Sequence, residues 1–288
     1  MPGMKSHAWL VFLLLQSGIV AAEECVPATW LRLDGERAAA VAPGALVAEI
    51  AARDVVLLGE RHEEADHHRW QLHTLAALHA QRPGMVIGFE VFPRRTQPVL
   101  DRWVAGALTA EQFLAEVQWD KVWKLSAELY LPLFEFARLH RVPMLALNVE
   151  RRLTQEVAAK GWDAVPEAER EGVSRPAPAP QAYVDELARV HKEHKAAGSL
   201  ANFVAAQQTW DRAMAQALAA RAGEALVVGI IGSGHLRHGH GVALQLRDLG
   251  VKRIATLLPV EAARCSELVL GLADAVFVLP GRGGSSAR

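Results

Sequence analysis

The sequence has little that would mark a disulfide-built, disordered or nucleic-acid-binding protein. It contains only two cysteines in 288 residues, too few for bridges to replace a hydrophobic core. Its 31 basic and 32 acidic residues give a formal net charge of −1, without a long block of one sign. This balance argues against a nucleic-acid scaffold, which normally presents a basic face. An apolar content of 51% is enough for a substantial core, so disorder over most of the chain is disfavoured.

The two cysteines, Cys25 and Cys265, lie far apart in the sequence. In an oxidising compartment an even number permits one disulfide, which would tie down the start of the mature chain. Two unpaired thiols are the alternative. The sequence leaves both open, because the geometry of the fold decides between them.

Long apolar runs are also scarce, and the N-terminus resembles a secretory signal peptide over residues 1–22. Lys5 gives a positive start, residues 8–15 form an apolar core, and small residues permit cleavage after Ala22. The apolar core is too short to span a bilayer comfortably, which disfavours a membrane anchor. Glu24 precedes Cys25, where a lipoprotein would need a small residue, so a lipid anchor is not supported. We therefore expect export to the periplasm or cell envelope.

Short β-rich runs alternate with longer amphipathic segments. This alternation predicts an α/β fold with a mostly parallel sheet and helices on both faces. We expect one domain over residues 23–280, with a helical insertion at about 150–223 between the third and fourth strands and a flexible tail at 281–288. The expected strands are Val55 to Leu58, Met85 to Phe89, Met144 to Leu147, Leu226 to Ile231, Arg253 to Leu258 and Ala275 to Leu279.

Local patterns predict two helices and one extended loop. Apolar positions at helical spacing predict a helix over 64–81. A second helix is expected over 108–115, opened by Thr109 as its cap with Gln112 three residues later. The proline-rich stretch at 172–181 must be extended and divides the helical insertion.

Polar residues follow the expected strands where each one ends. The stretch VVLLGERHEEADHH, residues 55–68, runs from a buried strand into a polar cluster. Ligands of open parallel sheets bind beyond the carboxyl ends of the strands, so these side chains should meet in one crevice. The residues at the strand ends are Glu60 and His62, then Glu90, then Asn148 and Glu150, then His235.

A histidine and carboxylate set permits two kinds of chemistry. Such side chains bind zinc, manganese, cobalt or related divalent ions, and they also serve as acids and bases. A helical stripe places Gln207 and Asp211 within an otherwise apolar seam. We expect these two residues and Asn148 to support the crevice from behind, and a purely structural hydrogen-bond network remains the alternative for the helical pair.

Five ordered motifs resemble the ChaN-like group of the Tiki/TraB superfamily over roughly residues 55–250. They are LLGERHEEADHH, GFEVFPRRTQPVLDRW, ALNVERR, AQQTWDRAMA and GIIGSGHLRHGHGV. The superfamily pairs two G-x-x-H elements with acids, which here are Gly59 to His62 and Gly232 to His235 with Glu60 and Glu90. The resemblance implies haem binding and iron-regulated uptake at the cell envelope. Relatives are often lipoproteins, which this sequence does not support.

The haem hypothesis needs an axial ligand, and the resemblance leaves several candidates. The bound partner would be haem or another iron species. It would be held by one chain or between the two copies of a homodimer. Uptake proteins of the envelope are also expected as partners, and nucleic acid is not. Trp119, Trp123 and the proline-rich loop could supply apolar flanks. The candidate ligands are Tyr130, Tyr183, His62, His67 and His235.

The competing hypothesis is a metal-dependent hydrolase, as found in other branches of the superfamily. Glu60, His62, Glu90 and His235 would then hold a divalent metal that activates water, with one carboxylate as the base. The resemblance to the ChaN-like group favours a binding protein first and this enzyme second, although family membership determines the fold more than the activity.

Overall fold

The computed structural model describes residues 25–194 and 197–281. The expected signal peptide, and the expected tail from residue 282 onward, lie outside these residues. Within the described part of the chain, no helix is both long enough and apolar enough to cross a membrane.

One eight-stranded sheet organises the described chain, in the order β2-β1-β8-β7-β3-β6-β4-β5. The strands from β8 to β5 run parallel, whereas β1 pairs antiparallel with both β2 and β8. This confirms the mostly parallel α/β fold and the six expected strands. The strands are β1 (Trp30–Arg32), β2 (Ala39–Val41), β3 (Val55–Glu60), β4 (Val86–Pro93), β5 (Met144–Asn148), β6 (Val227–Gly232), β7 (Ile254–Glu261) and β8 (Ala275–Leu279).

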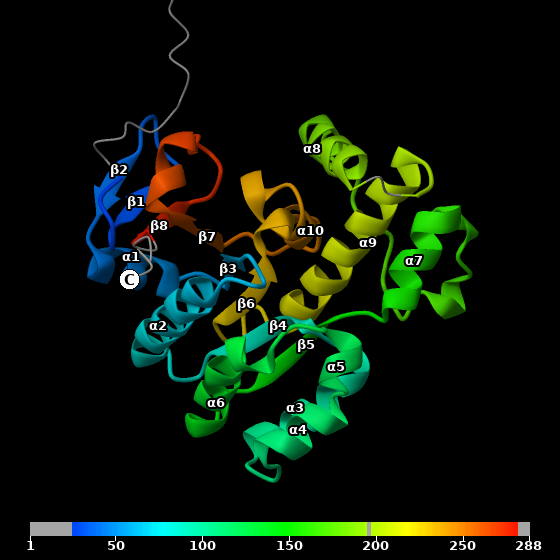
Figure 1. Cartoon of the computed structure of the whole chain (residues 1–288), viewed down its shortest axis with the longest axis horizontal. Coiled ribbons are helices and arrows are strands. Elements are labelled where there is room, and N and C mark those ends of the chain that lie inside the picture. Colours follow the sequence, from blue (N-terminus) through cyan, green and yellow to red (C-terminus); the bar gives the residue numbers. More distant parts are fainter. Residues whose placement is uncertain (1–24, 195–196, 282–288) are drawn as a thin grey trace, which may run out of the picture.

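Helices cover both faces of the sheet, as Figure 1 shows. The expected helix over 64–81 is present as α2, and Thr109 caps α4 with Gln112 in a capping box. The α-helices are α1 (Pro43–Ala51), α2 (Ala65–Gln81), α3 (Gln97–Val104), α4 (Ala110–Glu116), α5 (Trp119–Val122), α6 (Leu131–Leu139), α7 (Arg151–Lys160), α8 (Gln181–Glu193), α9 (Leu200–Ala219) and α10 (Val242–Asp248).

The central strand β3 is buried on both faces because its side chains alternate between two cores. Val56 and Leu58 pack into the core beneath α1 to α6. Val55 and Leu57 pack into the core beneath α9 and α10. A run of four apolar residues without alternation is therefore what a central parallel strand requires. The strand carries its next residues directly to the polar edge of the sheet.

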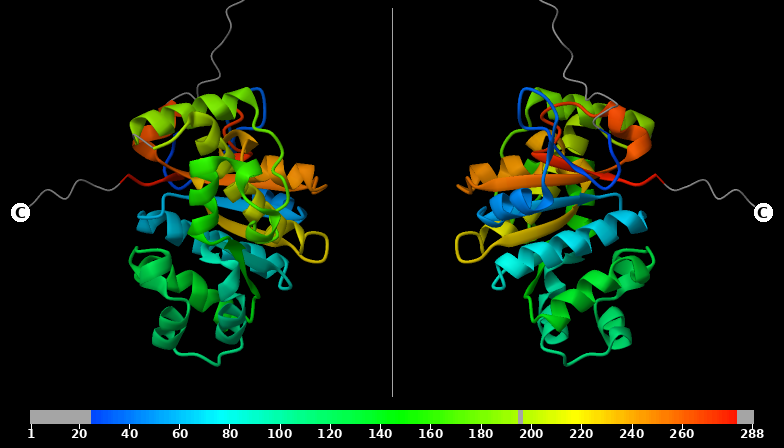
Figure 2. Two further views of the ribbon diagram at one scale, coloured as in Figure 1. Left: turned by 90° about the vertical axis from the view of Figure 1, so that its right-hand side faces the viewer. Right: turned by 90° about the vertical axis from the view of Figure 1, so that its left-hand side faces the viewer.

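The helical excursion after β5 lies at one end of the molecule. In the side views of Figure 2, α8 in yellow-green lies at the top and the green and teal helices of residues 97–139 gather at the bottom. The expected proline-rich loop precedes α8 without regular structure. Its Ala177 is fixed to α10, since Gln245 accepts from the Ala177 amide at 2.9 Å and donates to its carbonyl at 3.0 Å. This contact attaches the excursion to the sheet layer.

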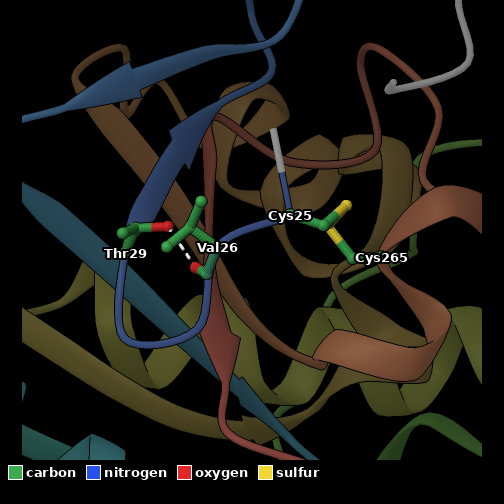
Figure 3. Close-up of a disulfide and its surroundings, with 4 residues drawn as sticks. All are labelled: Cys25, Val26, Thr29 and Cys265. Atoms are coloured by element: carbon green, nitrogen blue, oxygen red, sulfur yellow. Dashed lines mark hydrogen bonds between the residues drawn. A yellow bond between two sulfur atoms is a disulfide. The ribbon is translucent and has the colours of Figure 1, made fainter. Parts of the chain in front are cut away.

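The disulfide that the sequence left open is present. Cys25 and Cys265 are bonded, with an S–S distance of 2.05 Å and a sequence separation of 240 (Figure 3). Beside the bridge, the Thr29 hydroxyl donates to the Val26 carbonyl at 2.5 Å, and the chain then enters β1, the second strand from the edge of the sheet. The bond therefore fixes the first described residues to the segment between β7 and β8.

Candidate functional site

The site lies at the carboxyl ends of β3, β4 and β6, the crevice that the sequence predicts. Glu60 and Glu90 are almost completely buried at 2% and 1% exposure, while His62 follows β3 and His235 follows β6. Parallel pairing of these strands brings the motifs together, since Glu60 lies in register with Gly232. The structure thus joins residues more than 170 positions apart in the sequence.

The first half of the site is a chain of three side chains. The Tyr130 hydroxyl donates to Glu60 Oε1 at 2.5 Å, and His62 Nδ1 lies 2.7 Å from the same oxygen. Because a carboxylate only accepts, His62 carries its proton on Nδ1 and leaves Nε2 free. The His62 ring packs edge-on against Trp123 at 4.8 Å between centroids. Its side chain is 35% exposed, so the ring reaches the surface of the crevice.

His68 completes this half from within the core. Its Nε2 lies 3.0 Å from the His62 carbonyl, and its Nδ1 lies 3.1 Å from Gln71 Oε1 and 3.2 Å from Glu60 Oε2. All three partners are acceptors, which favours the doubly protonated ring. Burial raises the pKa of Glu60, but His62 and His68 outweigh it and lower that pKa to about 2. Glu60 is therefore a buried anion paired with a buried cation.

The second half repeats the first on the other side of the crevice. The Tyr183 hydroxyl donates to Asp211 Oδ2 at 2.9 Å, and His235 Nδ1 lies 2.7 Å from Asp211 Oδ1. The His235 ring packs against Trp210 at 5.0 Å between centroids. Both halves are thus a tyrosine, a carboxylate and a histidine held by Nδ1, with a tryptophan beside the ring.

Glu90 lies between the two halves. Its Oε2 accepts from the Gly232 amide at 2.6 Å, and its buried Oε1 makes no hydrogen bond to any described residue. His235 Nε2 lies 3.8 Å from that oxygen. A Cβ added at Gly232 would lie 2.9 Å from the His62 ring and 3.4 Å from Glu90, so only glycine leaves room here.

A cavity of about 720 Å³ adjoins the site. Its walls include Trp123 and Trp210, the two rings that pack against His62 and His235. Such a volume falls within the range of roughly 300–1,000 Å³ that is usual for cofactor sites. Four basic residues also line the cavity, namely Arg95, Lys121, Lys124 and Arg151. Among them Arg95 is paired, with its Nε 2.5 Å from Glu150.

The remaining predicted residues lie at different distances from this cavity. Asn148 lines the cavity and donates to the Glu90 carbonyl at 2.9 Å, so it fixes the end of β4. Asp211 holds His235, whereas the side chain of the half-buried Gln207 makes no hydrogen bond to another described residue. His67 points elsewhere, because its Nδ1 accepts from the Arg61 amide at 2.9 Å and its Nε2 lies 3.3 Å from Glu261.

The expected apolar flanks are partly in place. Trp123 lines the cavity, but Trp119 is buried and its indole donates to the Leu125 carbonyl at 2.7 Å. The proline-rich loop contributes Pro176 and Pro178 to a separate hollow beside Trp162. The apolar walls of the cavity beside the histidines therefore come from Trp123, directly after α5, and from Trp210 of α9.

Two site residues, His68 and Trp210, were not predicted from the sequence. His68 stands in the quoted stretch that follows β3, and its position one helical turn after Glu64 was the available signal. Trp210 belongs to the predicted stripe with Asp211, but its contact with His235 depends on how α9 packs across β6. No pattern in the sequence alone gives that packing.

The predicted metal set is only partly assembled. Over residues 25–194 and 197–281, no group of three or more His, Cys, Asp or Glu side chains is arranged to hold a metal ion. Glu60 Oε1 is already shared by Tyr130 and His62. The metal-dependent hydrolase stays a prediction from the sequence.

The buried His235 pair predicts a pH-dependent stability. Burial lowers the pKa of His235, but Asp211 and Glu90 outweigh it and raise that pKa to about 9. Because this pKa is raised in the folded state, the charged His235 ring contributes its full stabilisation of the fold below the unfolded pKa of about 6.5. This stabilisation is lost as the pH rises through about 9. We expect Asp211→Asn to remove on the order of 3 kcal/mol of this pH-dependent free energy of unfolding.

Urea denaturation at pH 6, 8 and 10 measures this effect. The free energy of unfolding of the unchanged protein should fall from pH 6 to pH 8 and again from pH 8 to pH 10, and the curve of Asp211→Asn should be flatter. Because the substitution also leaves the Tyr183 hydroxyl without its acceptor, the slope with pH is compared instead of the absolute stability. Parallel curves for the two proteins would contradict the assignment.

The fold and the site together define an α/β protein with a histidine and carboxylate centre at the carboxyl ends of a parallel sheet. The family model for haem-binding uptake proteins of the Tiki superfamily, ChaN, matches residues 46–246. The chain belongs to this family. No curated protein matches it.

One solved structure agrees with the fold over most of both chains, and two others are similar to a lower degree. A structure described as cofacial heme binding to ChaN of Campylobacter jejuni has a TM-score of 0.68 at 21% identity, and covers 88% of this chain and 98% of its own. The RRSP effector domain of a MARTX toxin from Vibrio vulnificus has a TM-score of 0.48 at 16% identity, with 85% and 41% covered. An erythromycin esterase, EreC, has a TM-score of 0.48 at 10% identity, with 75% and 72% covered.

Proposed function

We propose that this protein binds haem in the cavity between Trp123 and Trp210, with His62 as the axial ligand. The observation that carries the proposal is the position of the His62 ring: it is held by Glu60 through Nδ1, is partly exposed and lies against a tryptophan of the cavity wall. Histidine is a common axial ligand of haem iron, and a fixed Nδ1 proton leaves Nε2 as the donor.

The other candidate ligands are less accessible. Tyr130 and Tyr183 are 0% and 2% exposed, and each hydroxyl donates to a carboxylate. Burial and then the neighbouring carboxylate raise the pKa of each phenol, which opposes the phenolate form that binds iron. Both nitrogens of His67 are engaged, and the side chain of His235 is only 12% exposed.

The residues around the cavity suit haem. When bound, haem supplies an iron with a free axial position, a flat apolar ring and two propionates. Trp123 and Trp210 offer flat apolar walls, and Lys121, Lys124 and Arg151 make no ion pair with other described residues. Buried atoms at the site also lack partners: Glu90 Oε1 and the Trp210 indole nitrogen. Such orphaned groups are expected where a ligand completes the site.

The cellular role follows from the same proposal. The Cys25–Cys265 bridge supports export, because disulfides persist in oxidising compartments. We therefore propose that the mature protein carries or stores haem in the periplasm or cell envelope as part of haem or iron uptake. We also propose that two copies of the chain form a homodimer that shares haem between its two open cavities. The protein would further interact with uptake partners in the envelope.

A hemin titration of mature protein, beginning at Glu23, tests the function. The expected result is a saturable shift of the Soret band that fits one site per chain. Tyr130→Phe and Tyr183→Phe should retain a spectrum of the same coordination type, because neither hydroxyl is the ligand. Analytical ultracentrifugation with and without hemin measures whether two chains associate on binding.

Two outcomes would overturn the proposal. One is the absence of a shifted band in protein that unfolds cooperatively. The other is a divalent metal found by elemental analysis in the protein as purified, bound in place of haem, which would favour the hydrolase instead. A spectrum that changes type in Tyr130→Phe alone would leave haem binding intact and move the ligand to that tyrosine.

A further inference from the structure

A separate hollow lies toward the other end of the sheet from the proposed haem cavity. Its volume is about 600 Å³, and it lies between the first turns of α2, the start of β1 and the end of β8. The 720 Å³ cavity adjoins the ends of β4 and β5, at the opposite end of the strand order, and the two share no lining residue. In Figure 1, α2 and β8 lie on the left, and α5, α7 and α9 lie on the right.

Three aromatic side chains contribute to the wall of this hollow, from Trp30, Trp70 and Phe277. The ring centroids of Trp30 and Trp70 lie 5.8 Å apart with their planes at 54°. Those of Trp30 and Phe277 lie 5.1 Å apart with their planes at 65°. The inclined rings thus present both faces and edges, and aromatic groups prefer edge-on and offset contacts. A flat aromatic ligand suits such a wall.

The indole of Trp70 lacks a partner for its N–H group. Trp70 is only 4% exposed, and its buried Nε1 makes no hydrogen bond to any residue that the structure describes. By contrast, the buried Trp103 and Trp119 each donate this N–H to a backbone carbonyl, at 2.8 and 2.7 Å. A buried donor without an acceptor costs free energy. A ligand that carries a hydrogen-bond acceptor would complete this one.

The charge of the lining does not favour an ion. The hollow is lined by one carboxylate, of Asp66, and one guanidinium, of Arg69. Arg69 Nη1 donates to Asp66 Oδ1 at 2.6 Å, so the two groups form an ion pair without net charge. Pro43 and Leu279 add apolar surface to the three rings. The burial of apolar surface would therefore supply most of the binding free energy of an uncharged ligand.

The residues that follow Gly281 do not offer a group of this kind. Gly281 is the last described residue, and it lines the hollow together with Pro280. Residues 282–288 have the sequence RGGSSAR, without an aromatic or large apolar side chain. A separate molecule is therefore the better match to the aromatic wall.

We propose that this hollow binds a small, uncharged, flat aromatic molecule that carries a hydrogen-bond acceptor. The three rings contact its faces and edges, and the Trp70 indole N–H donates to its acceptor. A volume of about 600 Å³ suits such a ligand, since small-molecule sites usually measure roughly 300–1,000 Å³.

The experiment measures binding of quinoline and naphthalene to the full mature chain by ligand-detected NMR, at a pH where quinoline is uncharged. Both probes are flat two-ring molecules, but only quinoline has an acceptor nitrogen. Trp70→Phe keeps an aromatic ring and removes the N–H, so it should weaken quinoline relative to naphthalene roughly three- to tenfold. Phe277→Ala removes part of the wall from a half-buried position and should weaken both probes by at least about fivefold. No haem is added, so the result is independent of the proposed function.

Trp162→Phe is the matched control. Trp162 is 6% exposed and its buried Nε1 also lacks a partner among the described residues, but it does not line this hollow. The control should leave both affinities unchanged. Thermal unfolding of each variant without ligand verifies the fold, and Phe277→Ala carries the test if Trp70→Phe does not fold.

Four outcomes would overturn the proposal. An unchanged ratio of the two affinities in folded Trp70→Phe would remove the assignment of the acceptor. Equal binding by the unchanged protein and Phe277→Ala would remove the hollow as the site. A loss in Trp210→Phe in place of these variants would put the probes in the 720 Å³ cavity instead. The fourth is an absence of binding to the unchanged protein.

Discussion

Replacing His62 with alanine is expected to abolish the shifted Soret band and to weaken hemin binding by at least on the order of 100-fold. Substitutions behind a ligand typically cost 10–100-fold, and the loss of the ligand itself should cost more. The side chain is 35% exposed, so its removal leaves no large buried cavity. The measurement is a hemin titration followed by absorbance, with resonance Raman spectra to identify the coordination.

His73→Ala is the matched control, because His73 is an exposed histidine of α2 outside the site. It should bind hemin as the unchanged protein does. His235→Ala tests the other half of the centre and should weaken binding less than His62→Ala, since His235 is held between Asp211 and Glu90. A spectrum retained in His62→Ala but lost in His235→Ala would contradict our choice of ligand.

The affinity for hemin should also depend on pH in a defined direction. Burial lowers the pKa of His62, but Glu60 and Glu90 outweigh it and raise that pKa above 6.5. Only the neutral ring can bind iron, so binding at His62 displaces a proton from the charged form. Hemin binding should therefore strengthen as the pH rises through the His62 titration, and titrations in buffered series between pH 6 and 9 measure it. A constant affinity would argue for a ligand that does not titrate in this range.

Much of the sheet could be predicted because central parallel strands carry an unmistakable pattern. The apolar runs at Val55 to Leu58 and Leu226 to Ile231 have one structural interpretation, and both became strands. The two strands β1 and β2 at this end of the sheet have three residues each, too few to form a period. They exist because β8 offers a free edge for antiparallel pairing, which is a property of the folded sheet.

The sequence predicted where the site lies more completely than which of its side chains contact one another. The rule about strand ends located Glu60, Glu90 and His235 from their positions alone. It could not pair Tyr183 with Asp211, because α8 and α9 meet only through the packing of the helical excursion. The repeated arrangement of tyrosine, carboxylate and histidine is therefore visible only in three dimensions. Tyr130, directly before α6, and Tyr183 of α8 converge on it without any shared motif.

Removing the disulfide should produce the largest loss of stability among these variants. The bond closes a loop of 240 positions, for which loop-closure entropy alone gives an upper value of about 5 kcal/mol. Measured losses for native bridges are typically about 2–5 kcal/mol. We expect Cys25→Ser, Cys265→Ser and the double variant to lose free energy of unfolding within that range. Urea denaturation with and without dithiothreitol measures it.

The sequence offers an internal control for this effect. Because the chain has only two cysteines, reductant should destabilise the unchanged protein and leave the double variant unaffected. A loss confined to the sheet edge is also expected, since the bond joins residues beside β1 to the segment before β8. Hydrogen exchange should then rise in β1 and β2 while β3 and β6 stay protected. Equal stability of the single variants and the unchanged protein would mean that pairing along β1 and β8 holds this edge by itself.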